Sequence, residues 1–215
     1  MSIDIYAHIS IPGRRRTTSV SRAEAHFLNT FVSELNASLT LEVGLAYGRS
    51  AAHIMSATTC PHHAIDPFQA TIFENAGEEN LRGLGLANRL VLHQERSHSA
   101  LPKLVSEGLR FQFAFIDGGH KFDDVFVDFF YVDALLENNG WVMLHDMWMR
   151  SIQMTASWIR TNRREYREHR TPCRNLCLFQ KRGEDTREWH DFSEFYTCRS
   201  MVRHGLFNLR QAMKQ

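Results

Sequence analysis

The sequence lacks the features that mark membrane-spanning, secreted and disordered proteins. No uninterrupted run reaches the roughly 18 apolar residues that suggest a transmembrane helix. At the N-terminus the charged residues follow the apolar ones, which is the wrong order for a secretion signal. Only five prolines occur in 215 residues, and the formal net charge is +1, so the composition does not indicate disorder or attraction to anionic surfaces. We therefore expect a globular, cytoplasmic protein that binds neither nucleic acid nor membranes.

Cysteine is scarce as well, and its spacing does not favour a zinc site. The four cysteines (Cys60, Cys173, Cys177 and Cys198) include no C-x-x-C pair. Cys173 and Cys177 flank or lie in a predicted strand, which favours buried free thiols. Free thiols agree with a reducing compartment.

The length and the apolar content suit a single folded domain. Apolar residues make up 43% of the chain, and no Pro- or Gly-rich linker divides it. We predict one domain, 1–215, with an N-terminal helical segment (1–38), a core (39–183) and a C-terminal extension (184–215). A homodimer is one expectation for the extension, because it contains several aromatic residues: Phe192, Phe195, Tyr196 and Phe207.

Apolar periodicity predicts strands that alternate with helices. Strands are predicted at 39–43, 62–68, 89–94, 111–117 and 140–146, with two further candidates at 166–171 and 175–181. Helices are predicted at 21–36, 49–58, 71–87, 99–108, 121–137 and 150–163. This alternation is typical of βαβ units with right-handed crossovers. The sequence therefore predicts an α/β fold: a Rossmann-like, doubly wound, mainly parallel seven-stranded sheet with helices on both faces.

Two of the predicted helices carry distinctive patterns. In the first, Ser21 and Glu24 have the spacing of a capping box. In the helix at 121–137, we expect one apolar side, formed by Phe122, Val125, Phe126, Phe129, Phe130 and Leu136. We expect the acids on the opposite, solvent-facing side: Asp123, Asp124 and Asp128.

The turn after the first strand, EVGLAYGRS, indicates a ligand that approaches the backbone closely. Gly44, Ala46 and Gly48 are small residues placed just before a helix, at the edge where doubly wound sheets bind ligands. A dinucleotide fingerprint fits poorly, because Arg49 stands where the third glycine belongs, and no Walker-type phosphate loop occurs. A turn without a ligand and an NAD(P)-linked oxidoreductase both stay open as alternatives at this point.

Two longer stretches resemble a known family. LEVGLAYGRSA resembles motif I of the class I S-adenosylmethionine-dependent methyltransferases. IDGGHKFDDVFVDFFYVDALLENNGWVMLHD resembles an O-methyltransferase-like subgroup with an I-D-G-x-H motif, related to antibiotic-tailoring sugar O-methyltransferases and catechol-type enzymes. The resemblance runs from about residue 39 to 146, half the chain. It implies S-adenosylmethionine as cofactor and a small hydroxylated molecule as methyl acceptor.

The resemblance also implies which residues bind the cofactor. Gly44, Ala46 and Gly48 would approach its amino-acid part, and Glu42 would orient the turn or the ligand's ammonium group. Further cofactor residues would be Asp66 at the ribose hydroxyls, Phe68 over the adenine, Ser97 at the adenine edge, and Asp117. Two of these residues also have alternatives without a ligand contact: Asp66 can be an exposed acid at a strand end, and Phe68 can be a core phenylalanine.

Asp117 and Asp146 end two predicted strands and form the expected reaction corner. Adjacent strands lie about 4.8 Å apart, so the two carboxylates can converge, and they then repel each other unless a cation binds or a pKa rises. Oxygen ligands suit Mg²⁺. By the resemblance, both aspartates match metal ligands of the catechol-type enzymes, but Met147 stands where those enzymes have an asparagine. His120 or His145 in its place would favour Mn²⁺ or Fe²⁺, and a site without metal stays open.

His120 is the expected catalytic base, together with Asp117. By the resemblance it matches the catalytic lysine of the catechol-type enzymes, and an imidazole with a pKa near 6.5 is suited to accepting a hydroxyl proton. The alternative is a structural histidine that caps the next helix or pairs with Asp124 or Asp128. For His145 we favour a structural role over metal binding. A non-catalytic relative that kept the fold is a further alternative.

Overall fold

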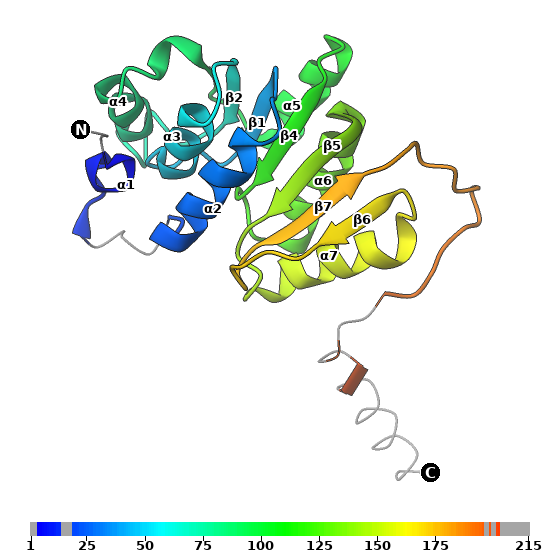
Figure 1. Ribbon diagram of the computed structural model, residues 1–215. Coiled ribbons are helices and arrows are strands. Elements are labelled where there is room, and N and C mark those ends of the chain that lie inside the picture. Colours follow the sequence, from blue (N-terminus) through cyan, green and yellow to red (C-terminus); the bar gives the residue numbers. More distant parts are fainter. Residues whose placement is uncertain (1–3, 14–18, 196–197, 199–200, 203–215) are drawn as a thin grey trace.

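The computed structural model of the chain describes residues 4–13, 19–195, 198 and 201–202. These residues form a twisted sheet with helices on both faces (Figure 1). Its seven strands are β1 (Thr40–Val43), β2 (His62–Ile65), β3 (Leu90–His93), β4 (Phe111–Ile116), β5 (Leu136–Leu144), β6 (Tyr166–His169) and β7 (Cys177–Lys181). The order is β3-β2-β1-β4-β5-β7-β6, and only the β5–β7 and β6–β7 pairs are antiparallel. The predicted seven-stranded, mainly parallel sheet is confirmed.

The helices cover the two faces of this sheet (Figure 1). Their bounds are α1 (Ile5–His8), α2 (Arg22–Ser33), α3 (Arg49–Ser56), α4 (Ala76–Gly83), the 3-10 turn η2 (Ala87–Arg89), α5 (Ser97–Ser106), α6 (Phe122–Leu135) and α7 (Arg150–Asn162). Side chains of α2 and α3 pack on one face, and those of α5, α6 and α7 pack on the other. Helix α2 begins with the predicted capping box, because Ser21 accepts from the Glu24 amide and the Glu24 carboxylate accepts from the Ser21 amide.

The alternation of side chains along the central strands decides which residues face α2. In β4, Phe113 and Phe115 pack against α2, while Ala114 and Ile116 pack against the α5–α7 layer. All four are almost fully buried, and burying each phenylalanine stabilises the fold by about 1.5–3 kcal/mol. Since the period of a strand is two residues, the next residue on the α2 side after Phe115 is Asp117.

Strand β1 has β2 on one side and β4 on the other. The strands that follow β1 in the chain are therefore added first toward one edge of the sheet and then toward the other. In doubly wound sheets this reversal opens a crevice beyond the carboxyl ends of the strands. Gly44 follows β1 here with a φ of 98°, and a Cβ at this position would collide with the backbone carbonyl of Asp117. Glycine is therefore required for the turn after β1 to pass the end of β4.

The helix predicted at 71–87 is wrong in extent. Helix α4 covers only Ala76–Gly83, and turns replace the rest of the predicted helix before it. Glu74 and Asn75, at φ of 52° and 60°, are in the left-handed region that ends helical continuity. The chain turns here because the Gln69 backbone oxygen accepts from the Asn75 amide at 2.6 Å.

The predicted apolar side of the helix at 121–137 also needs correction. Phe122 and Phe130 are 40% and 59% exposed, whereas Asp128 is fully buried. Leu136 belongs to β5, because the helix ends at Leu135. Helix α6 packs between α5 and α7, and its apolar residues lie almost all round it, so the apolar pattern alone does not select the buried side. Burial raises the pKa of Asp128 to about 6.

Several smaller expectations concern the thiols and the C-terminal extension. The four cysteines are free, with Cys60 and Cys177 buried, Cys173 half-buried and Cys198 exposed. Of the aromatic residues in the extension, Phe192 is 67% exposed, while Tyr196 and Phe207 lie outside the described residues. Within the part of the chain that the structure describes, no helix has the length and apolar character needed to cross a membrane.

Candidate active site

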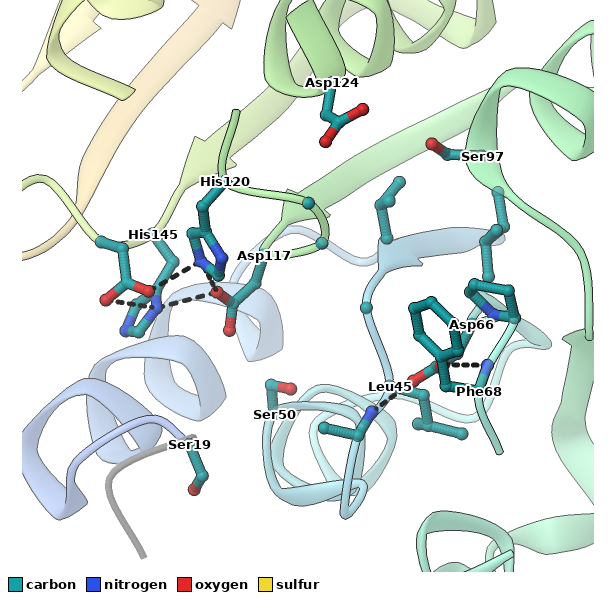
Figure 2. Close-up of a pocket in the computed structure, with 18 of the residues that line it drawn as sticks. Ser19, Leu45, Ser50, Asp66, Phe68, Ser97, Asp117, His120, Asp124 and His145 are labelled. Atoms are coloured by element: carbon teal, nitrogen blue, oxygen red, sulfur yellow. Dashed lines mark hydrogen bonds and ion pairs between the residues drawn. The ribbon is translucent and has the colours of Figure 1, made fainter. Parts of the chain in front are cut away.

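A cavity of about 490 Å³ opens at the carboxyl ends of the central strands (Figure 2). Its size suits a ligand as large as a nucleoside derivative. Nine of the predicted site residues line it: Gly44, Ala46, Asp66, Phe68, Ser97, Asp117, His120, His145 and Asp146. Two others, Glu42 and Gly48, do not line it. The strand-end rule therefore brought most of the predicted residues into one cavity.

The turn between β1 and α3 is fastened to the end of β2. The Ala46 amide donates to Asp66 Oδ2 at 2.7 Å, and Gln69 Nε2 donates to the Ala46 carbonyl oxygen at 2.7 Å. Ala46 has a φ of 46°, an uncommon value for a residue with a Cβ. Gly48 lies against α4, where a Cβ would come within 2.9 Å of the Gly77 carbonyl oxygen. The turn is thus a backbone cradle held by hydrogen bonds and close packing.

Asp66 is the residue that organises this cradle. It is 3% exposed and accepts from the amides of Ala46 and Phe68 (2.8 Å) and from Gln69 Nε2 (3.0 Å). A carboxylate offers about four lone-pair positions, so three donors leave room for a ligand hydroxyl. Phe68 is 37% exposed at the cavity wall, with the Arg96 guanidinium 5.7 Å from its ring centroid. It is therefore not a core phenylalanine.

Ser97 and Asp124 lie at the same side of the cavity (Figure 2). Ser97 is the first residue of α5. Asp124 was expected on the solvent-facing side of its helix, but it lines the cavity and packs against Gly119, where a Cβ would come within 2.7 Å of its carboxylate. Helix α6 begins directly after the reaction corner, so a side chain in its first turn borders the cavity.

Glu42 does not line the cavity, so it does not reach the space expected for the cofactor's ammonium group; it interacts instead with Ser50, in the helix that follows the turn. It shares the α3 side of β1 with Thr40 and is fully buried, with His62 Nε2 3.5 Å from its carboxylate. Burial raises the pKa of Glu42 well above its usual range, and the charges of Asp117 and Asp66 act in the same direction, against a lowering by Ser50. Burial thus favours the uncharged form of this carboxyl.

The reaction corner contains two aspartates and two histidines (Figure 2). Ile116 pairs with Leu144 in the parallel register, so Asp117 comes directly beside His145, and their Oδ1 and Nδ1 atoms are 3.0 Å apart. Asp146 has a φ of 56°, a left-handed conformation that aspartate tolerates better than most residues. His120 Nε2 is 2.8 Å from Asp146 Oδ2 and 3.7 Å from Asp117 Oδ1. His120 pairs with these two acids and not with Asp124 or Asp128.

The charges in this corner stabilise one another. Hydrogen bonds to Asp117 and Asp146 raise the pKa of His120 to about 9. Burial alone would lower the pKa of His145, but the carboxylates of Asp117, Asp146 and Glu24 outweigh it and raise this pKa to about 12. Burial would raise the pKa of Asp146, yet His120 and His145 hold it well below its usual range. The two carboxylates are thus balanced by two imidazoles.

A divalent cation fits part of this corner. One ligand atom each from Asp117, His120 and Asp146 lies within 4.8 Å of the other two, so one ion can contact all three. Two carboxylate oxygens and one imidazole nitrogen suit Mn²⁺ or Fe²⁺ better than Mg²⁺. His145 was the tentative third ligand, but both of its ring nitrogens face other side chains of the protein. Of the two histidines, His120 is the one whose ring nitrogen groups with the two aspartates.

Three residues at the corner were missed as site residues or given little weight. Glu24 faces His145 Nε2 at 3.5 Å, and Asn175 Nδ2 is 3.2 Å from the same nitrogen. Trp148 is 71% exposed, lines the cavity and donates from Nε1 to Asp146 Oδ1 at 2.9 Å. Glu24 had a signal in its capping box, and Trp148 in its closeness to Asp146. Asn175 comes from the segment before β7 and had no local signal.

The strand order, the glycine turn after β1 and the strand-end carboxylates define a class I methyltransferase fold. Residues 41–147 match a family model described as a methyltransferase domain. The chain belongs to the class I S-adenosylmethionine-dependent methyltransferases, as the resemblance implied. No curated protein matches the sequence significantly.

Solved structures share this fold at low sequence identity. The O-methyltransferase TomG of Streptomyces achromogenes, involved in tomaymycin synthesis and crystallised with S-adenosylmethionine, is 17% identical, with a TM-score of 0.71 over 85% of this chain and 92% of that chain. An O-methyltransferase of Bacillus cereus in complex with S-adenosylhomocysteine is 16% identical, with a TM-score of 0.67 over 82% and 87%. A putative caffeoyl-CoA O-methyltransferase of Staphylococcus aureus is 14% identical, with a TM-score of 0.65 over 77% and 85%.

Proposed function

We propose that the protein transfers the methyl group of S-adenosylmethionine to a hydroxyl oxygen of a small molecule. One observation carries the proposal: a backbone cradle and a corner of titratable side chains line the same cavity. The cradle suits a cofactor that has no phosphate and needs close backbone contact. The corner suits an acceptor that must lose a proton during transfer. The solved structures named as O-methyltransferases support the choice of oxygen as acceptor atom.

The reaction assigns a role to each group in the corner. The acceptor oxygen attacks the methyl carbon in line with the carbon–sulfur bond, whose electrons pass to sulfur and leave S-adenosylhomocysteine. His120 takes the acceptor proton at Nε2, the nitrogen that faces Asp117 and Asp146, and the two carboxylates stabilise the imidazolium that forms. Since these acids raise the pKa of His120 to about 9, the rate should increase with pH as the imidazole loses its proton.

The same corner has the donors for a metal-assisted version of this chemistry. Asp117, His120 and Asp146 would hold a divalent cation, which lowers the pKa of a bound hydroxyl. His120 would then be a ligand and no longer a base. Calorimetric titration of the chelator-treated protein with Mn²⁺ separates the two roles: one bound ion, lost in Asp146→Asn, supports the ligand role, and no binding supports the base role.

Calorimetry with S-adenosylhomocysteine and with NADH tests the proposed function. We expect S-adenosylhomocysteine to bind with a stoichiometry of one and NADH not to bind. Methyl transfer from labelled S-adenosylmethionine to a panel of phenols, catechols and sugars then tests the acceptor atom. Failure of the first ligand to bind would overturn the proposal, and so would methyl transfer that survives the loss of both Asp117 and His120.

A further inference from the structure

His145 is enclosed by polar groups from three other segments of the chain and from its own neighbour Asp146. Its Nδ1 atom is 3.0 Å from Asp117 Oδ1 and 3.4 Å from Asp146 Oδ1. Its Nε2 atom faces Glu24 Oε2 at 3.5 Å and Asn175 Nδ2 at 3.2 Å. The ring is 6% exposed, so it cannot turn to reach a substrate without breaking these contacts. His145 therefore acts on the reaction corner only through its neighbours.

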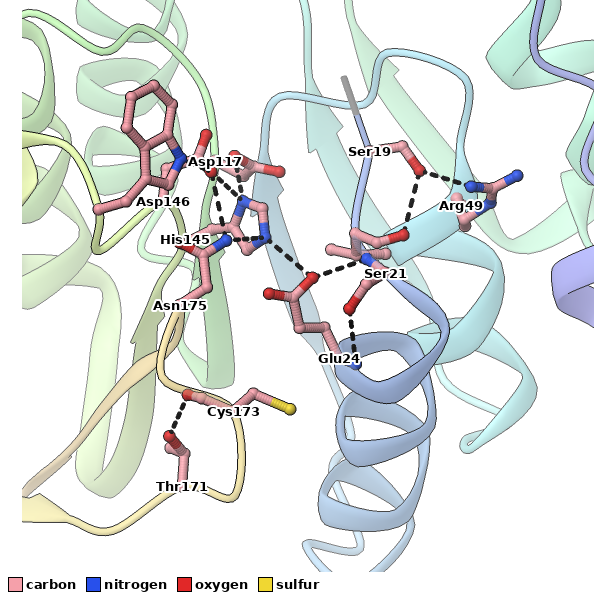
Figure 3. A network of polar contacts seen from close by, with 12 residues as sticks. Ser19, Ser21, Glu24, Arg49, Asp117, His145, Asp146, Thr171, Cys173 and Asn175 are labelled. Carbon is pink, nitrogen blue, oxygen red and sulfur yellow. Dashed lines mark hydrogen bonds and ion pairs between the residues drawn. The ribbon is translucent and has the colours of Figure 1, made fainter. Parts of the chain in front are cut away.

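Glu24 connects this ring to the N-terminal helix (Figure 3). Its Oε2 atom accepts from the Ser21 amide at 2.6 Å and is the same atom that faces His145. The side chain is almost fully buried, although it comes from the first turn of a surface helix. Burial would raise the pKa of Glu24, but His145 and Ser21 outweigh it and lower this pKa to about 2. A capping residue with only a local role does not need a partner at the end of another element, here His145 directly after β5.

The segment just before α2 is part of the cavity wall. Ser19 and Val20, which directly precede the capping box, line the cavity. Arg49, the first residue of α3, donates from Nη1 to Ser19 Oγ at 3.0 Å. The wall is thus attached to α3 on one side and to the reaction corner, through Glu24, on the other (Figure 3). It lies N-terminal to the residues that match the family model, 41–147.

A chain of contacts consequently runs from α2 to the predicted base. It passes from Glu24 through His145 to Asp117, and from Asp117 to His120. Asn175 Nδ2 lies 3.2 Å from Nε2 of the same ring and donates to Asp146 Oδ1 at 3.3 Å. Positioning groups of this kind typically change activity by about 10- to 100-fold when removed, because small misplacements of reacting groups slow catalysis.

We propose that Glu24 is a positioning residue of the reaction corner, which holds His145, and through it Asp117 and His120, in the arrangement that methyl transfer requires. The catalytic part of this inference rests on the proposed function, whereas the chain of contacts does not. The alternative is that Glu24 only stabilises α2. The two readings differ in what happens at His120, which Glu24 does not touch.

Two variants of the capping box separate these readings. Glu24→Gln keeps a side chain that satisfies the capping box and removes the charge that faces His145. Ser21→Ala weakens the same cap, by about 1 kcal/mol, without removing any group that contacts His145. Both variants should therefore destabilise α2 to a limited extent, but only Glu24→Gln should alter the corner.

The first measurement is the NMR spectrum of the histidine side chains in ¹⁵N-labelled protein without added ligand. We expect the ring nitrogen signals of both His145 and His120 to shift in Glu24→Gln and to stay in place in Ser21→Ala. If the His120 signals are the same in wild type and Glu24→Gln, the proposal is overturned. Because this measurement needs no turnover, it remains decisive even if the proposed methyl transfer proves wrong.

The second measurement is methyl transfer with catechol as the probe acceptor. Glu24→Gln should lower kcat by about 10- to 100-fold while KM for S-adenosylmethionine changes less than threefold. In an His145→Asn background the same change should have almost no further effect, since Glu24 acts through that ring. Equal losses of kcat in Glu24→Gln and Ser21→Ala, or additive effects of Glu24→Gln and His145→Asn, would contradict the proposal.

Discussion

The two halves of the cavity are built in different ways. On the cofactor side, backbone groups form most of the wall. The turn from Gly44 to Gly48 is held by hydrogen bonds that join its main chain to Asp66 and Gln69. In the reaction corner, four charged side chains hold one another, and the backbone only brings them together. The first half is shaped by conformation and the second by charge. The two should therefore respond to mutation in different ways, one through ligand affinity and stability and the other through rate.

The largest effect should come from the base. We expect His120→Ala to lower kcat by about 10²- to 10⁴-fold, the usual contribution of a general base. Its affinity for S-adenosylhomocysteine should change less than threefold, because the cradle is untouched. Kinetics and calorimetry on the same preparation check this separation. A large loss of affinity without a loss of kcat would show that the two halves are not distinct.

The turn after β1 should show the opposite behaviour. In Gly44→Ala the new Cβ collides with the Asp117 carbonyl at a φ of 98°, so we expect a loss of about 2–4 kcal/mol in stability and weakened S-adenosylhomocysteine binding. Gly85→Ala is a matched control, because Gly85 also has a positive φ (72°) but open space around it. The control should lose only about 1 kcal/mol. Equal melting temperatures for the two variants would contradict the steric account.

A change at Asp66 should have an effect of intermediate size, because Asp66 belongs to the cradle and also has an oxygen free to accept from the ligand. Asp66→Asn replaces one accepting oxygen by a donor that faces the donors of Ala46, Phe68 or Gln69. We expect roughly tenfold weaker S-adenosylhomocysteine binding, with kcat at saturating cofactor within a factor of three. A variant with unchanged affinity would mean that Asp66 serves the turn alone.

The smallest effect on cofactor binding and rate should come from Asp128, which does not line the cavity; its effect should be on stability and should depend on pH. Burial raises its pKa from 3.8 to about 6 in the folded protein, so the folded state binds more protons than the unfolded state between these values. Stability should therefore fall as pH rises through this window. Asp128→Asn should be more stable than wild type above pH 6, by on the order of 2 kcal/mol, and equal to it near pH 4. Thermal unfolding across this range checks it, with Glu137→Gln, an exposed carboxyl, as the control.

The sequence predicted the fold and most of the cavity because both depend on local patterns. Apolar strands ending in acids placed Asp66, Asp117 and Asp146 at one edge of a parallel sheet, and the structure has them there. The prediction for Glu42 was less accurate because it considered the strand end but not the alternation of faces, which directs this side chain under α3. Side-chain direction along β1 depends on a register that only the assembled sheet fixes.

The remaining differences arise from contacts between distant segments. Asn175 reaches the corner through the β6–β7 connection, and Glu24 through the packing of α2 on the sheet. Neither contact has a signature in nearby sequence. Asp128 and Phe130 exchanged their expected positions because α6 has apolar residues on nearly all sides, and its neighbours decide which side is buried. Periodicity identifies such a helix but not its orientation.

The most direct test of the account is a calorimetric titration of S-adenosylhomocysteine into wild type and His120→Ala. We expect one binding site in both proteins, with affinities within threefold of each other, because we assign cofactor binding to the cradle and the acceptor proton to His120. An absence of binding to wild type would contradict the assignment of the cavity. Binding to wild type that disappears in His120→Ala would contradict the division between cofactor cradle and reaction corner.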